Sequence, residues 1–161
     1  MKKKIWIGVL VAVMVGLLYG YWTEWRFERI KVYNAIQYID EYEENYYKVK
    51  FKLERGWFGS SGVKIIYFLP GQKEKMMSKI KEDVINYLEE IIEKHGDIFY
   101  KYEVSDDFKQ VLVYETSCDN KHMHNDILDG QISSLVWLYH DIKNDRSSDV
   151  GQVVTVIEPD D

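Results

Sequence analysis

The residues best suited to metal chemistry lie in one short stretch of the chain. Four side chains there carry the nitrogen, sulfur and oxygen donors that zinc and similar ions bind, namely Cys118, His122, His124 and Asp126. The first three could ligate one ion if the segment formed a curled loop, with water or Asp126 in the fourth position. Their spacing matches no established zinc pattern. The alternative interpretation is the polar start of a helix, with Cys118 as a small apolar strand residue and one of the two residues after it as the helix cap.

Other arrangements of catalytic residue types are weaker. The sequence Gly59-Ser60-Ser61-Gly62 differs from the G-x-S-x-G of serine hydrolases and joins two predicted strands, so we expect a plain hairpin loop there. His95 lies where it suits the C-terminus of a helix, and His140 lies on the flank of another. The sequence contains no phosphate-binding glycine loop, dinucleotide fingerprint or H-E-x-x-H motif. It therefore predicts no catalytic residue and no cofactor.

Two features are suited to binding rather than to catalysis. Lys48, Lys50 and Lys52 repeat about every 6.6 Å along one face of a predicted strand, a spacing that fits an anionic polymer or lipid headgroups. The alternative role of these lysines is to protect a sheet edge from pairing with another sheet. Trp57 and Phe58 follow in a predicted turn, where they either fold back onto the core or contact a ligand or a bilayer.

The charge of the chain argues against nucleic acid as a partner. Its 161 residues include 21 Lys and Arg against 27 Asp and Glu, which gives a net charge of −6. Because residues 1–23 contain three lysines and no acid, the rest of the chain is more acidic still. An acidic field repels a phosphate backbone, and the sequence has no basic and aromatic recognition motif. Cys118 is the only cysteine, so the fold has no internal disulfide and depends on its core.

The first residues predict a membrane anchor. After a short basic tail at 1–4, residues 5–23 contain no charge and would extend over roughly 28 Å as a helix, close to the hydrocarbon thickness of a bilayer. Aromatic residues near both ends, such as Trp6 and Trp22, suit the boundary between lipid and water. We expect one transmembrane helix that contacts the lipid bilayer through residues 5–23 and a single-pass location in the cell membrane, with the N-terminus cytoplasmic and the C-terminal domain extracytoplasmic. The alternative is a signal peptide whose cleavage releases a secreted domain.

The rest of the chain predicts an α+β fold. Residues 24–46 contain no Gly or Pro and place apolar residues along one helical stripe, so we expect a juxtamembrane helical stalk. Residues 47–158 are expected to form an extracytoplasmic α+β domain with the order ββα-ββα-β. Its predicted strands are 48–54, 63–69, 98–104, 108–117 and 150–157, and its predicted helices are 73–95 and 122–143. Helices on one face of a mainly antiparallel sheet would form a two-layer sandwich.

These features together favour a single-pass membrane-anchored protein whose small acidic domain is a non-enzymatic binding or interaction module. Its partner would be a protein or an envelope component that contacts the sheet face or the turn at Trp57 and Phe58. The alternative function is a metal-assisted enzyme that uses Cys118, His122 and His124, with Asp126 beside them.

Overall fold

The computed structural model describes residues 2–22, 26–56, 59–116, 130–143 and 152–157. Its elements in chain order are α1 (Lys2–Gly20), β1 (Glu28–Val32), the 3-10 helix η2 (Ile36–Asn45), β2 (Lys48–Gly56), β3 (Gly59–Phe68), α2 (Gln72–Lys94), β4 (Phe99–Val104), β5 (Gln110–Glu115), α4 (Gln131–Lys143) and β6 (Gln152–Ile157). The predicted order ββα-ββα-β is confirmed from β2 onward, with one further strand, β1, ahead of it.

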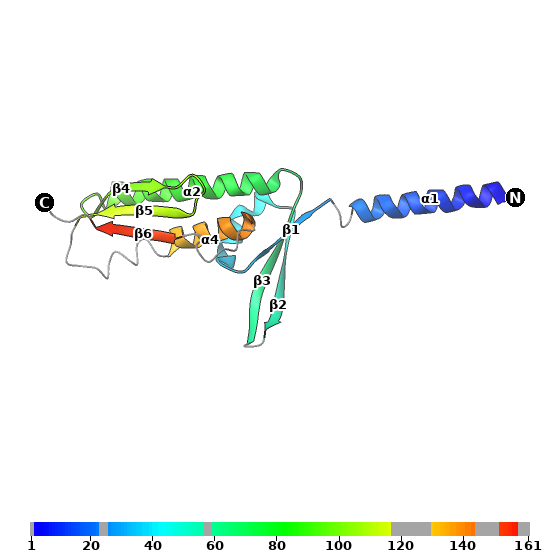
Figure 1. Cartoon of the computed structure of the whole chain (residues 1–161), viewed down its shortest axis with the longest axis horizontal. Helices are drawn as coiled ribbons and strands as arrows, with labels where there is room; N and C mark the ends of the chain where they lie inside the picture. Colours follow the sequence, from blue (N-terminus) through cyan, green and yellow to red (C-terminus); the bar gives the residue numbers. More distant parts are fainter. Residues whose placement is uncertain (1, 23–25, 57–58, 117–129, 144–151, 158–161) are drawn as a thin grey trace.

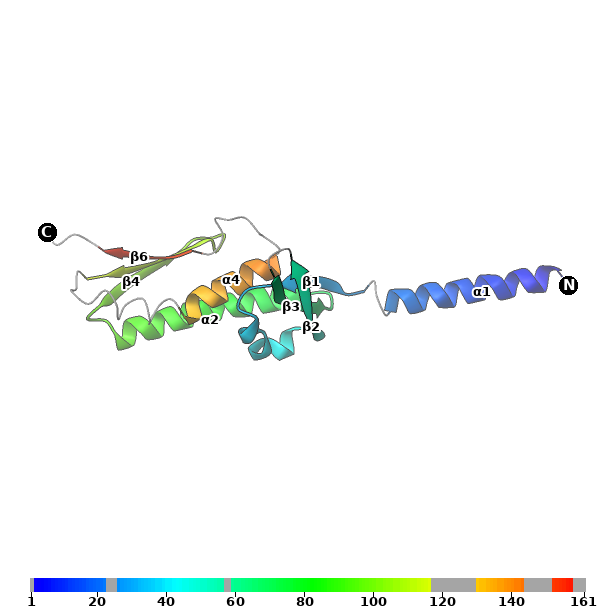
Figure 2. The same ribbon diagram turned by 90° about the horizontal axis from the view of Figure 1, so that it is seen from below.

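Helix α1 extends away from the rest of the molecule (Figures 1 and 2). Within the described ranges, no helix combines the length and the apolar character needed to cross a bilayer. The transmembrane helix predicted over 5–23, and with it the single-pass location in the cell membrane, is therefore wrong. The α-helix has 19 residues, but three are the lysines at its start and it ends at Gly20. Its uncharged part rises only about 24 Å, less than the roughly 30 Å of a hydrocarbon core.

A three-stranded antiparallel sheet, the first sheet, has the order β1-β3-β2. Its strand β1 corrects the predicted helical stalk at 24–46. In Glu28–Val32 the apolar Ile30 and Val32 alternate with Arg29 and Lys31, and the structure buries the first two on the core side. Residues 28–32 therefore form a strand paired with β3, although the apolar spacing of the longer segment 24–46 favours a helix. The part of the stalk that is helical is η2, which buries Ile39 and Tyr42.

A second three-stranded sheet has the order β4-β5-β6. Strands β4 and β5 form an antiparallel hairpin, and β6 pairs with β5 in parallel. A parallel neighbour requires a crossover connection, which α4 supplies between β5 and β6. The predicted single, mainly antiparallel sheet is thus replaced by two sheets, one antiparallel and one mixed.

Both sheets pack on a layer formed by α2 and α4, which lie side by side (Figure 2). Helix α2 buries Met76, Ile80, Val84 and Leu88 at steps of four residues, and α4 is buried along most of its length. One continuous core joins these helices to Ile66 and Phe68 of the first sheet and to Val111 and Val113 of the second. The predicted α+β class, with helices layered on sheets, is confirmed.

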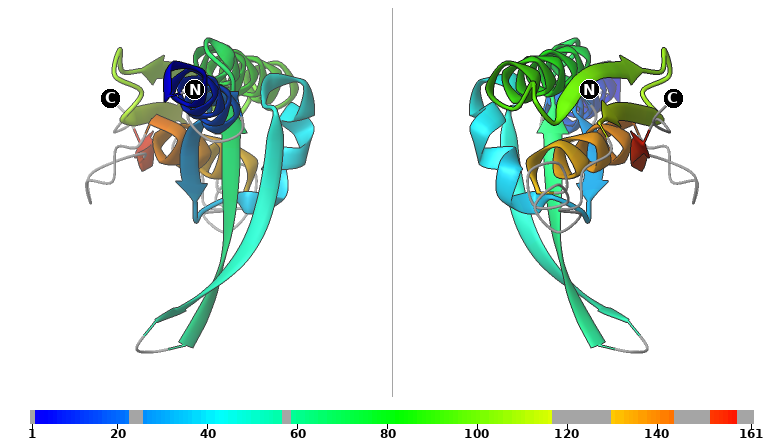
Figure 3. Two further views of the ribbon diagram at one scale, coloured as in Figure 1. Left: turned by 90° about the vertical axis from the view of Figure 1, so that its right-hand side faces the viewer. Right: turned by 90° about the vertical axis from the view of Figure 1, so that its left-hand side faces the viewer.

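The β2–β3 hairpin is longer than the core that supports it. β1 pairs with β3 only as far as Lys64, whereas β2 continues to pair from Lys64 out to Gly59. The distal part of the hairpin, residues 52–56 and 59–63, therefore extends away from the body (Figure 3). We call this part the arm. Gly59 to Gly62, expected to be loop, belongs to β3 within the arm.

Candidate interaction surface

The predicted metal ligands do not fall in the part of the chain that the structure describes. Cys118, His122, His124 and Asp126 all lie between the described ranges that end at 116 and begin at 130. Among the described residues, no three His, Cys, Asp or Glu side chains gather closely enough to hold a metal ion. The metal site therefore stays a prediction. Trp57 and Phe58 also lie outside the described residues.

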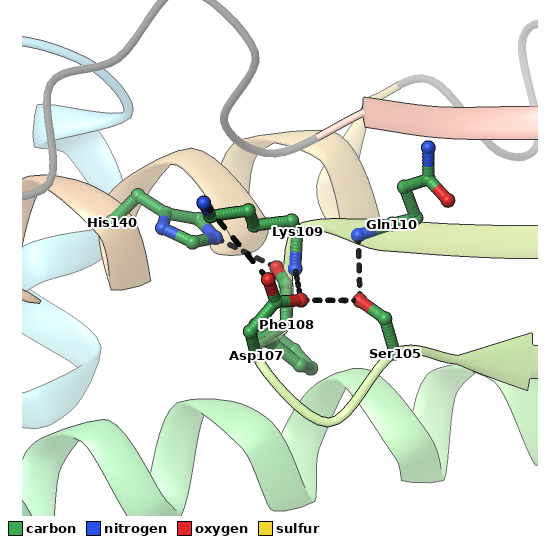
Figure 4. Close-up of polar contacts among 6 residues, drawn as sticks. All are labelled: Ser105, Asp107, Phe108, Lys109, Gln110 and His140. Carbon is green, nitrogen blue, oxygen red and sulfur yellow. Dashed lines mark hydrogen bonds and ion pairs between the residues drawn. The ribbon is translucent and has the colours of Figure 1, made fainter.

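His140 has a structural role in the turn between β4 and β5. It is 2% exposed on α4, and its Nε2 donates a hydrogen bond to the carbonyl oxygen of Phe108, 2.7 Å away (Figure 4). Phe108 has a φ of 62°, a conformation uncommon for a residue with a large side chain. The hydrogen bond from α4 fixes this backbone, so His140 joins the second sheet to the helix layer.

Ser105 and Asp107 complete the same turn (Figure 4). The hydroxyl of Ser105 donates to Asp107 Oδ1 at 2.9 Å, and the same oxygen accepts the backbone N–H of Lys109 at 3.1 Å. These two hydrogen bonds, the serine's first, lower the pKa of Asp107. Because the hydroxyl is bound to a carboxylate and not to His140, the three residues do not form the relay that activates a serine nucleophile.

A set of cations gathers on the outer face of the first sheet. The strand register places Arg29, Tyr67 and Lys48 in one row across the three strands, and Lys31, Ile65 and Lys50 in the next row. Lys52 continues the line along β2 beside Val63. Side chains at alternate strand positions share a face, so these basic residues lie opposite the face that packs on the core. We call this surface, formed by Arg29, Lys31, Lys48, Lys50 and Lys52 around Tyr67 and Ile65, the cationic face.

The ring of Tyr67 lies among three of these cations. Its centroid is 4.7 Å from Lys48 Nζ, 5.5 Å from Lys50 Nζ and 5.6 Å from Arg29 Cζ. Each such contact contributes about 0.5–1 kcal/mol at an exposed site. Because three cations lie close to the ring, the face is suited to binding anionic groups and not to stacking of bases on the ring.

Glu54 ties the two edges of the cationic face together. Its carboxylate accepts a hydrogen bond from Lys31 Nζ at 2.7 Å and a longer one from the hydroxyl of Tyr33 at 3.4 Å, and Lys52 Nζ lies 3.9 Å away. The bridge from Lys31 to Glu54 crosses β3, and Val63, which lies between them in register, is fully buried. The Lys31 hydrogen bond is the main cause that lowers the pKa of Glu54.

Neighbouring lysines along β2 repel one another. Successive lysines on β2 are about 6.6 Å apart, where two unit charges repel by about 0.6 kcal/mol in a water-like medium. Lys50 lies between Lys48 and Lys52, and Glu54 offsets part of the repulsion at the Lys52 end. An anionic partner would remove this repulsion on binding.

The sequence pattern predicts three of the five basic residues of this surface. The alternation of Lys48, Lys50 and Lys52 was enough to predict one row of cations. Arg29 and Lys31 were missed because residues two apart diverge on the helix predicted there, whereas they share a face on a strand. The signal available was the short alternation of Glu28–Val32, which pairs each basic residue with an apolar neighbour.

A groove between α2 and α4 has less support as a binding site than the cationic face. A groove of about 250 Å³ lies where the end of α2 meets the start of α4, beside Tyr87 and Ile132. Its two charged residues, Glu90 and Lys94, form an ion pair with each other across one helical turn. This pairing leaves less charge to direct toward a ligand than the cationic face has.

No protein-family model matches this chain, and no curated protein matches its sequence.

Proposed function

We propose that this protein is a non-enzymatic interaction module that binds an anionic partner on the cationic face. The observation that carries the proposal is the segregation of charge. Five basic side chains share one face of the first sheet with a single carboxylate, Glu54, among the described residues, although the whole chain has a net charge of −6. Because this face is positive and the whole chain is negative, an anionic partner is attracted to this one surface.

The arrangement of the cations supports the same proposal. Two lines of basic side chains, on β1 and on β2, flank the central strand, where Ile65 and Tyr67 lie. The lines are about two strand spacings apart, or roughly 10 Å. An extended anionic segment lying along the sheet would contact both lines and would replace the repulsion between like charges with attraction.

The proposal is tested with a charge-neutralised variant and a matched control. The test protein carries Lys48→Gln, Lys50→Gln and Lys52→Gln. The control carries Lys75→Gln, Lys79→Gln and Lys94→Gln, which removes the same charge from exposed positions on α2. Binding of fluorescent poly-L-glutamate is measured by anisotropy at low and at moderate salt. Each exposed lysine–carboxylate pair contributes about 0.2–1 kcal/mol, so the test protein should bind at least about threefold more weakly than wild type.

The control protein should bind within about twofold of wild type, and added salt should weaken wild-type binding. Equal losses in the two variants would mean that net charge alone governs binding, which contradicts a role for the cationic face. Absence of salt-sensitive binding to wild type would contradict the proposal as well.

A further inference from the structure

Strand β2 presents an open sheet edge. In the described part of the chain it pairs with β3 alone, so the backbone groups along its other side face no strand. Such an edge can hydrogen-bond with an additional strand. At nine residues, Lys48–Gly56 is long enough for an extended peptide to pair with it over several residues.

The two faces of this edge strand differ in chemistry. Lys48, Lys50 and Lys52 point to the cationic face, and the alternate residues Phe51 and Leu53 point to the other face. Phe51 is 61% exposed and Leu53 is 63% exposed. The Phe51 ring lies across the backbone of β3 at Gly62, where an added Cβ would come within 2.9 Å of it. The edge therefore offers charge on one side and apolar surface on the other.

Edge protection explains the lysines but not the apolar pair. A row of lysines disfavours pairing with a second copy of β2, because like charges would face each other across the new strand pair. Two large exposed apolar side chains on the same edge have the opposite effect, since they favour covering by a partner. The arm is also only two strands wide beyond Lys64, an arrangement that is marginally stable in water until a third strand joins it.

We propose that β2 accepts an extended polypeptide as a fourth strand of the first sheet, and that this partner alternates acidic and apolar residues. Its acidic side chains lie opposite Lys48, Lys50 and Lys52, and its apolar side chains cover Phe51 and Leu53. The alternation follows from the pleat, which places successive side chains of any added strand on opposite faces. This inference rests on the proposed function, because it specifies the anionic partner of the same surface.

The test compares short peptides of equal composition. One alternates Glu and Val, and the other has all its Glu residues before all its Val residues. Binding to the full chain is measured by fluorescence anisotropy of end-labelled peptide. The alternating peptide should bind at least about tenfold more tightly, because only its pattern matches both faces of β2. Equal affinity for the two peptides would overturn the inference and leave the proposed function intact.

Backbone methylation tests for strand addition without altering the protein. Two further alternating peptides carry N-methyl groups, one on every Glu amide and the other on every Val amide. Amides of alternate residues in a strand point to the same side, so one of the two peptides should lose binding and the other should keep it. Retention of binding by both would overturn strand addition.

A variant and a matched control test the apolar side of the edge. Phe51→Thr with Leu53→Thr keeps strand propensity and should weaken binding of the alternating peptide by about tenfold while leaving poly-L-glutamate binding within twofold. The control, Val154→Thr on the exposed edge strand β6, should leave both unchanged. Sedimentation of the wild-type chain tests whether the partner at this edge is a second copy of the chain. A dimer that the Phe51→Thr, Leu53→Thr variant abolishes would overturn the inference, since the occupant would then be a second copy.

Discussion

The pKa of Glu54 depends on its ion pair with Lys31 on the cationic face. Because the hydrogen bond from Lys31 lowers the pKa of Glu54 in the folded protein, the ionised carboxylate stabilises the fold at pH values above its unfolded pKa. That contribution is lost as the pH falls through the lowered folded value. Lys31→Gln should raise the pKa of Glu54 toward the ordinary glutamate value, as measured by carboxyl carbon NMR. Lys75→Gln is the control, and a Glu54 pKa that does not respond to Lys31→Gln would contradict the bridge across β3.

Asp141 stabilises the fold by accepting two backbone hydrogen bonds. It is 8% exposed on α4, and its Oδ2 accepts the backbone N–H groups of Tyr33 and Asn34, each at 2.9 Å. Asp141→Ala leaves two amides without their acceptor and should destabilise the protein by about 2–3 kcal/mol in urea unfolding. Asp141→Asn keeps an acceptor oxygen and should cost less. Similar losses for the two variants would mean that charge, and not the acceptor, stabilises this junction.

The sequence predicts residues of the cationic face only where basic and apolar residues alternate over several positions. Lys48, Lys50 and Lys52 follow that rule. The place of Tyr67 among cations could not be predicted, because it depends on the register of β3 against both neighbours. Register is set by long-range pairing and by burial of the opposite face, and a single strand's sequence contains neither.

At the scale of elements, β1 and η2 illustrate how a local pattern misleads. The helical stripe predicted over 24–46 combined residues from a strand and from a 3-10 helix, which are separated by Ala35 in a left-handed conformation with φ 50°. The backbone just before this point is held by Asp141, more than one hundred residues away in sequence. Helix α2 was predictable because its apolar residues recur at steps of three or four from Met76 to Ile91, over about four turns.

The arm gives a prediction about one cross-strand contact. The Phe51 ring lies against Gly62, so the α-protons of Gly62 should have ring-current shifts that disappear in Phe51→Leu and persist in Leu53→Ala. Gly62→Ala should displace the exposed ring at a cost of less than about 1 kcal/mol, since the side chain can turn toward solvent. Gly62 α-proton shifts that are the same in wild type and Phe51→Leu would contradict this packing.

At the scale of the whole molecule, one core joins two sheets through the helix layer. Truncation of a fully buried residue in that layer, Leu135→Ala, should cost about 2–5 kcal/mol and should lower the unfolding midpoint of both sheets together. Hydrogen exchange of β3 and β5 amides measures the two sheets separately. The exposed substitution Ile85→Ala is the control and should change stability by less than about 0.5 kcal/mol. A second sheet that stays protected after the first has opened would contradict a shared core.

The net charge of the chain and the charge of its first sheet have opposite signs, and this difference defines the proposed binding surface. Composition alone led to the expectation that nucleic acid is repelled, and it could not locate a cationic face within an acidic molecule. Only the pairing of β1, β3 and β2 gathers residues from 29 to 52 onto one surface.

Chemical-shift mapping locates the surface to which an anionic partner binds. The isotope-labelled protein is titrated with the alternating Glu and Val peptide, and backbone amide shifts are followed by NMR. We expect saturable changes concentrated in β1, β2 and β3, at and around Arg29, Lys50 and Tyr67, that vanish in the Lys48→Gln, Lys50→Gln, Lys52→Gln protein. Changes concentrated instead on α2 or on the second sheet, or shifts that survive the loss of the three lysines, would contradict binding at the cationic face.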